Sequence, residues 1–190
     1  DYYEYIELYN PTDWDIDLKD WVLISDGSSI GDPQTISADI THSGDSTIIK
    51  AGGYAIIDDK NATATNIYDG LYYQVPVYSE NVIRLEIDDA DLGLRNDLSQ
   101  AWITLKDKNG VIVDKFAYSK DWNWAQGNGK AIEKLNPLCF SEPKDNWSEG
   151  QVGGTPGARN SNYLAIVLNY LPANYTVAKN AIFSPFFGTY

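Results

Sequence analysis

Oxygen ligands are concentrated in two short acidic stretches, and oxygen-only ligand sets of this kind suit Ca²⁺ better than zinc. The stretch at residues 88–97 offers Asp88, Asp89, Asp91 and Asp97. The stretch at residues 13–17 alternates aspartates with other residues, which is typical of the solvated face of a strand. Neither stretch has the glycine and distal glutamate of an EF-hand loop. We expect solvated acidic loops, with a structural Ca²⁺ site at residues 88–97 as the alternative.

Aromatic residues suggest a second kind of site. The densest exposed-looking group consists of Trp122, Trp124 and Tyr118, in a stretch rich in Asn, Gln and Gly. Aromatic rings can stack on the apolar C–H faces of sugars. We favour the other interpretation, in which these rings fold over an open end of the domain as part of its core. Buried rings would indicate a spacer, and coplanar exposed rings a carbohydrate-binding module.

Candidates for catalysis are few. The only histidine, His42, lies in a turn-like stretch without a nucleophile-elbow motif. The only cysteine, Cys139, lies among apolar residues and is typical of a small buried side chain. Glu4 and Glu7 would lie on opposite faces of one strand, so they cannot both be aimed at one substrate. We predict that the chain is not an enzyme and needs no cofactor.

Composition narrows the class of protein further. The chain has 190 residues, enough for one domain with a sizeable core. Lysine and arginine total 14 against 27 acidic residues, so the formal charge of −13 repels nucleic acid. We find no apolar run of the roughly 18 residues that a membrane span needs, and we expect no membrane insertion.

Periodicity in the sequence predicts strands rather than helices. Apolar residues alternate with polar ones over short stretches rich in Ile, Val, Tyr and Trp. Strands are predicted at residues 5–9, 16–18, 21–23, 54–58, 72–78, 82–87, 102–106, 111–116 and 131–135. Between two of them, Asn109-Gly110 predicts a two-residue type I′ hairpin turn. These features indicate an all-β, antiparallel sandwich or barrel.

The last thirty residues differ in composition from the rest. Residues 161–190 contain one charged residue, Lys179, while every tryptophan and every acidic residue lies before them. We therefore predict a main domain at residues 1–160 and an apolar arm at 161–190, or the start of a following β module. An exposed arm of this kind would be adhesive, so we expect it to add a strand to its own sheet or to form a homo-oligomer. Because the sequence lacks methionine and opens on Asp1, we expect a processed form or a fragment.

Several segments in order resemble one known family, the lamin tail domain. The resemblance rests on residues 4–11 (EYIELYNP), 16–18, 21–23, 48–54, 94–96, 103–114, Trp147 and 154–160 (GTPGARN). Two features differ from the prokaryotic pattern: Lys134 follows Glu133 where the family usually has arginine, and residues 161–190 match nothing in it. The resemblance implies an immunoglobulin-like antiparallel β-sandwich and a generally non-catalytic module of larger prokaryotic secreted or surface proteins.

The sequence thus predicts a non-enzymatic interaction or spacer module, secreted or at the cell surface, whose partners are neighbouring domains of its parent chain. The alternative is a carbohydrate-binding module of an extracellular enzyme, which would bind a surface glycan and could contain structural Ca²⁺. Because a fold does not name an activity by itself, the side chains of a site must decide between them.

Overall fold

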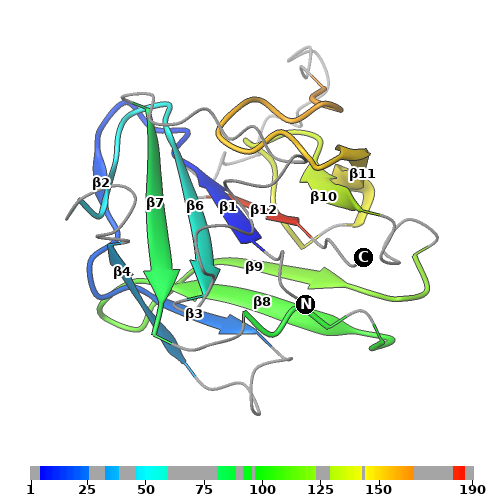
Figure 1. The fold of residues 1–190 in the computed structure, drawn as a ribbon, viewed down its shortest axis with the longest axis horizontal. Coiled ribbons are helices and arrows are strands. Elements are labelled where there is room, and N and C mark those ends of the chain that lie inside the picture. The colour runs from blue at the N-terminus through cyan, green and yellow to red at the C-terminus, as the bar shows by residue number, and fades with distance from the viewer. Residues whose placement is uncertain are drawn as a thin grey trace, which may run out of the picture.

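The structure is a computed structural model and consists almost entirely of strands (Figure 1). It describes residues 5–25, 33–38, 46–59, 81–88, 92–95, 97–122, 129–142, 144–164 and 182–186, with Asp59 and the last segment described as backbone only. The strands are β1 (Tyr5–Tyr9), β2 (Ile16–Asp17), β3 (Val22–Ser25), β4 (Gln34–Ala38), β5 (Ile48–Ile49), β6 (Tyr54–Asp59), β7 (Val82–Ile87), β8 (Ala101–Lys106), β9 (Ile112–Tyr118), β10 (Lys130–Lys134), β11 (Trp147–Val152) and β12 (Ile182–Phe186). Within the described ranges the only helical element is the 3₁₀ turn Lys144–Asn146, and no helix is long and apolar enough to cross a membrane.

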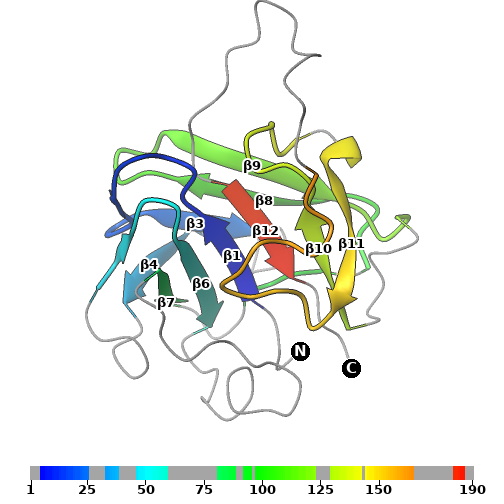
Figure 2. The ribbon, with the colours of Figure 1, turned by 90° about the horizontal axis from the view of Figure 1, so that it is seen from above.

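Ten of the strands form one long sheet in the order β11-β10-β12-β1-β6-β7-β4-β3-β8-β9, and β2 pairs with β5 beside it. Figures 1 and 2 show the sheet folded over on itself, so that β8 and β9 lie opposite β1 and β12. Strand pairs are antiparallel except β6 and β7, which run parallel. This architecture is the expected immunoglobulin-like β-sandwich, with one parallel pair that the alternating pattern alone does not reveal.

The core lies between the two layers of the folded sheet. Ile6 and Leu8 of β1 point into it and are fully buried, as are Ile103 and Leu105 of β8. Phe116 of β9 packs there against Trp147, with ring centroids 3.8 Å apart. Because side chains alternate along a strand, the odd-numbered residues of β1 point to the opposite face of the sheet. That outer face bears the candidate site described below.

Most of the predicted strands that lie within the described residues are present, and β7 has the predicted bounds. The sequence analysis missed β4, the two-residue β5 and β11, and it gave no bounds for β12. The sequences of β4 and β11, QTISA and WSEGQV, contain too few large apolar residues to stand out as strands. The predicted strand at residues 72–78 lies outside the described residues.

The β8–β9 hairpin is present, but its predicted turn type is wrong. A type I′ turn needs positive φ at both central residues, whereas Gly110 has φ +80° and Asn109 does not share that region. The Asp107 carboxylate accepts the backbone N–H groups of Asn109 and Val111, and the Gly110 N–H donates to the Asp107 carbonyl. This is a type I turn followed by a left-handed glycine, because the Asp107 side chain favours the three-residue hairpin.

Part of the apolar arm lies inside the sheet. Strand β12 pairs antiparallel with β1 over five residues, from Tyr5 opposite Phe186 to Tyr9 opposite Ile182. Its other side meets β10 at Ala131. In this structure the arm therefore adds a strand to its own sheet, while the domain boundary near residue 160 stays a prediction.

Candidate functional site

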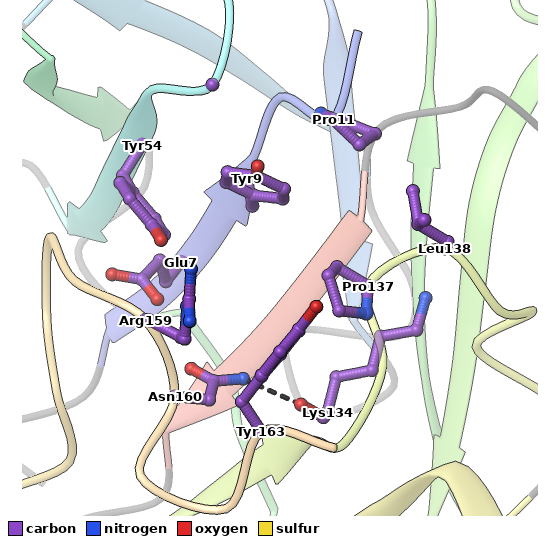
Figure 3. Close-up of a pocket in the computed structure, with 11 residues that line it drawn as sticks. Glu7, Tyr9, Pro11, Tyr54, Lys134, Pro137, Leu138, Arg159, Asn160 and Tyr163 are labelled. Atoms are coloured by element: carbon purple, nitrogen blue, oxygen red, sulfur yellow. Dashed lines mark hydrogen bonds between the residues drawn. The ribbon is translucent and has the colours of Figure 1, made fainter. Parts of the chain in front are cut away.

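A cavity of about 410 Å³ opens on the outer face of the sheet, near β1, β6 and β10 (Figure 3). It is lined by Glu7, Tyr9, Pro11, Gly52, Tyr54, Lys134, Pro137, Leu138, Arg159, Asn160 and Tyr163. Its volume falls within the roughly 300–1,000 Å³ of small-molecule sites. Tyrosine rings and one arginine dominate its wall, so its chemistry is that of a binding site.

One wall of the cavity is the segment 153–164, here called the strap, which crosses the outer face of β1 (Figure 2). The Tyr5 hydroxyl donates to the Gly153 carbonyl at 3.4 Å, and the Gly157 N–H donates to Glu7 Oε2 at 2.5 Å. At the far end, the Leu164 N–H donates to the Leu135 carbonyl. Side chains from β1 that would otherwise face water thus fix the path of the strap.

Gly157 brings the strap close to the sheet. Its φ is +73°, a region that side chains with a Cβ rarely adopt. A Cβ at this position would lie 2.9 Å from Val82 Cγ2. Both constraints require glycine where the strap donates its hydrogen bond to Glu7.

A second buried carboxylate, Glu133 of β10, holds the end of the strap. Its Oε2 accepts the Ser161 hydroxyl at 2.7 Å and the Asn162 N–H at 3.2 Å, and Oε1 accepts the Thr155 hydroxyl at 3.4 Å. Glu133 is 1% exposed, so these donors replace the water that a charged group would otherwise require. The strap therefore depends on two carboxylates buried in the sheet.

Burial sets the electrostatics beneath the strap. Desolvation raises the pKa of Glu7 well above its ordinary value, against the lowering effect of the Gly157 N–H, and the nearby Glu133 raises it further. Desolvation and the charge of Glu7 also raise the pKa of Tyr54 to about 12. Tyr54 therefore keeps its hydroxyl proton at neutral pH and can both donate and accept a hydrogen bond.

Arg159 is the cation at the mouth of the cavity. It is exposed, and its guanidinium carbon lies 4.7 Å from the centroid of the Tyr163 ring. Figure 3 shows it between Glu7 and Tyr163. Tyr9 and Tyr54 complete the wall on the other side, with ring centroids 5.0 Å apart and ring planes at 40°.

A serine lies within hydrogen-bond distance of Lys134, one of the residues that line the cavity. Lys134 Nζ donates to Ser141 Oγ at 2.7 Å, and Ser141 Oγ donates to Asp114 Oδ2 at 2.6 Å. Desolvation lowers the pKa of Lys134 to about 8, which would suit a general base. Both residues are 2% exposed, however, and their Nζ and Oγ atoms are engaged by these partners. The trio stabilises the 136–141 loop, whose carbonyl at Ser141 also accepts the Trp147 indole N–H.

The predicted aromatic group lies elsewhere in the structure. Tyr118 is 3% exposed and packs on Phe116 in the core, so it offers no face to a ligand. Trp122 is half-buried and also contacts Phe116, with centroids 6.1 Å apart. Trp124 lies outside the described residues. The position of Tyr118 agrees with the favoured interpretation, in which this ring is part of the core, because β9 alternation points it inward. Ligand binding by the Trp122, Trp124 and Tyr118 group stays a prediction.

Of the predicted calcium ligands, Asp88 and Asp97 are described, and both already accept hydrogen bonds. Both oxygens of the Asp97 carboxylate accept hydrogen bonds from the Arg95 guanidinium, at 2.7 and 2.5 Å. Asp88 Oδ1 accepts the Thr35 N–H at 3.0 Å. Asp89 and Asp91 lie outside the described residues. Among the described side chains no three of His, Cys, Asp or Glu converge as a metal site would require. Calcium binding stays an untested prediction.

The other candidate nucleophile and base have no described role. His42 lies outside the described residues. Cys139 is half-buried, and desolvation raises the pKa of its thiol, which is opposite to the shift of a reactive cysteine.

Sequence analysis did not select the residues that line the cavity. Glu7 and Tyr9 were assigned to a strand, and Arg159 appeared only within the GTPGARN motif. The available signal was the odd-numbered series Tyr5, Glu7 and Tyr9, which places large side chains on the face away from the core. That signal shows that the outer face is covered, and it does not show which segment covers it.

Comparison with known proteins gives one match. Residues 1–120 match the family model described as Lamin Tail Domain, which is more than half of the chain. Searches of curated proteins and of solved structures found no match. The matched region contains β1 to β9, and the family consists of non-enzymatic immunoglobulin-like domains. The chain belongs to the lamin tail domain family.

Proposed function

We propose that this chain is a non-enzymatic interaction or spacer module of a larger secreted or cell-surface protein of a prokaryote. The observation that carries the proposal is the structural role of the two buried carboxylates. Glu7 and Glu133 accept hydrogen bonds from the strap and so hold it in place. These groups stabilise a surface on which other molecules or neighbouring domains can dock.

The surface charge supports the same function. A formal charge of −13 repels nucleic acid and favours solubility. Partners are therefore expected among the neighbouring domains of the parent chain.

Catalytic activity gives the most direct test. The chain should turn over no chromogenic ester, phosphate monoester or glycoside above the buffer rate, with or without Ca²⁺ or Mg²⁺. Turnover that is lost in Ser141→Ala or Lys134→Met would overturn the proposal, because those residues form the one described serine–lysine pair. Protease treatment of intact cells of the source organism tests the location, since an exposed module is cut without lysis.

The arm suggests a second copy as a partner. The five-residue register between β12 and β1 could equally be made by the arm of another chain, which would give a strand-exchanged dimer. Light scattering of the full chain and of a chain ending at Asn160 tests this. A dimer that becomes a stable monomer on truncation supports exchange, and a monomeric full chain at all concentrations contradicts it.

A second candidate function is carbohydrate binding, favoured by one observation: three tyrosines surround the cavity on the strap face. Tyr9, Tyr54 and Tyr163 are half-buried, so parts of their rings stay accessible beside polar groups. This site lies apart from the predicted group of Trp122, Trp124 and Tyr118, whose ligand binding stays a prediction.

A further inference from the structure

The cavity contains a cation without an anionic partner. In the described part of the chain, the ion pairs are Lys50 with Asp15, Arg95 with Asp97 and Lys130 with Glu149, and Arg159 is in none of them. Acidic residues outnumber basic ones 27 to 14 in this chain, so an arginine that is in none of these ion pairs has donors to offer a ligand. The contact with Tyr163 orients the guanidinium plane at the mouth of the cavity.

The nearest buried carboxylate does not neutralise this cation. Glu7 gives its Oε2 to the Gly157 N–H, and no ion pair joins it to Arg159 among the described residues. Its carboxylate is thus engaged by the strap rather than by the guanidinium. An incoming carboxylate would therefore meet a planar donor group that is in none of the described ion pairs.

The shape of the surroundings favours a sugar over an extended peptide. A peptide that docks by strand addition needs an open strand edge. β1 has none next to the cavity, because it pairs with β6 on one side and with β12 on the other. The tyrosine rings instead offer faces for the apolar C–H groups of a pyranose.

We propose that this cavity binds an acidic sugar, a pyranose bearing a carboxylate, with the carboxylate on the Arg159 guanidinium and the ring against Tyr54 and Tyr163. This inference rests on the carbohydrate-binding function proposed above and specifies its ligand class. Arg159 recognises the charge because its parallel N–H groups match the two oxygens of a carboxylate. The tyrosines supply affinity for the ring whether or not it is charged.

Calorimetric titration with short oligogalacturonates and with their methyl esters tests the proposal, because esterification removes the negative charge of each carboxyl group and adds only a methyl group. We expect the acid to bind at least about tenfold more tightly than the ester, as a charge-assisted hydrogen bond predicts. Arg159→Gln should remove that preference. Arg95→Gln is the matched control, since it removes the same charge from a residue paired with Asp97 outside the cavity.

A third variant, Tyr163→Ala, should weaken binding of the ester, and should weaken binding of the acid at least as much, because it also removes the ring that contacts Arg159. The far-ultraviolet circular dichroism of each variant is compared with that of the wild type to confirm folding. Equal affinity for acid and ester, or equal losses in the two arginine variants, would overturn recognition of the carboxylate. Tighter binding of a short peptide with a free carboxyl terminus, lost in Arg159→Gln, would also overturn the sugar assignment.

The outcomes separate this inference from the functions on which it rests. Ester binding that is lost in Tyr163→Ala, without a preference for the acid, overturns the acidic ligand and leaves carbohydrate binding in place. No binding of either form overturns both. The spacer function is judged by the turnover and cell-surface experiments, which do not depend on any sugar.

Discussion

Carboxylates occur in two settings in this molecule, and the two settings have opposite consequences. Asp15, Asp97 and Asp107 lie on exposed loops, where hydrogen bonds from Lys50, Arg95 and the Val111 N–H are the leading causes that lower their pKa values. Glu7 lies beneath the strap, where desolvation raises its pKa.

Solvent and salt screen the interactions of exposed carboxylates, so their removal costs the fold little. Buried carboxylates fix the path of a covering segment, because backbone and side-chain donors of the strap bind to them. The comparison teaches that the stability contributed by a carboxylate depends on which hydrogen-bond donors would lose their acceptor if it were removed.

The largest effect is expected at Glu133. Glu133→Ala leaves the Ser161 hydroxyl and the Asn162 N–H without their acceptor and opens a cavity next to Gly150. We expect a loss of about 3 kcal/mol in the free energy of unfolding, measured by urea titration. Glu133→Gln keeps one acceptor oxygen and should lose less. Equal losses in the two variants would show that the hydrogen bonds to the strap contribute little.

The next largest effect is expected at Lys134, a buried cation. It should make the free energy of unfolding depend on pH, which extends the comparison of buried and exposed charges. Its folded pKa of about 8 lies below the ordinary value of 10.5, so between pH 8 and 10 the unfolded chain binds more protons. Stability of the wild type should therefore rise over this window, by roughly 2–3 kcal/mol relative to Lys134→Met. Below pH 8 the difference should be constant. Parallel curves from pH 7 to 10 would contradict the buried charge.

Gly157 tests how closely the strap must approach the sheet. Gly157→Ala combines a positive φ with a contact at 2.9 Å to Val82, and we expect a loss of about 2 kcal/mol by thermal unfolding. The matched control is Gly52→Ala, where φ is +69° and nothing lies within 4 Å of the added Cβ. It should lose about 1 kcal/mol, from backbone strain alone. If the two variants lose the same amount, the close approach adds nothing.

The contribution of Glu7 to the free energy of unfolding should depend on pH as expected for a buried carboxylate. Because its folded pKa is raised, its contribution is complete at low pH and is lost as pH rises above the ordinary glutamate value. Glu7→Gln keeps an acceptor for the Gly157 N–H and cannot ionise. The variant should therefore gain stability over the wild type as pH rises, measured by urea titration from pH 4 to 8. A difference that does not change with pH would exclude an ionisable buried Glu7.

The smallest effect is expected at the exposed loop. Asp97→Asn removes the pairing with Arg95 on a carboxylate that is 64% exposed, and solvent and salt screen that interaction. The thermal midpoint should be indistinguishable from that of the wild type. A midpoint lowered as far as that of Glu133→Ala would break the distinction between the two settings.

Much of the fold could be predicted from local pattern, as β1 and β7 illustrate. Their apolar alternation marks both the strand and the face that enters the core, since Ile6, Leu8, Leu85 and Ile87 are fully buried. The turn at Gly110 could be placed but not classified, because the side chain of Asp107 decides its type. β4 and β11 lack a strong pattern and depend on the neighbours that pair with them.

The candidate site was much less predictable than the fold. Its tyrosines come from β1, β6 and the strap, and no local spacing links Tyr9, Tyr54 and Tyr163. Conversely, Tyr118 and Trp122 are close together in sequence but do not form a common exposed face, because alternation sends Tyr118 into the core. Nearness along the chain was therefore a poor guide to nearness on the surface.

The sequence by itself determined the strands, the faces they bury, the acidic surface and the family. These properties follow from the period-two pattern, the composition and the order of short motifs, all of which are local or additive. Only the tertiary structure decided that the strap lies over β1, that Glu7 and Glu133 are buried beneath it and that Arg159 faces a tyrosine-lined cavity. Those outcomes depend on contacts between segments far apart in sequence, and the energy of such contacts exists only once the chain has folded.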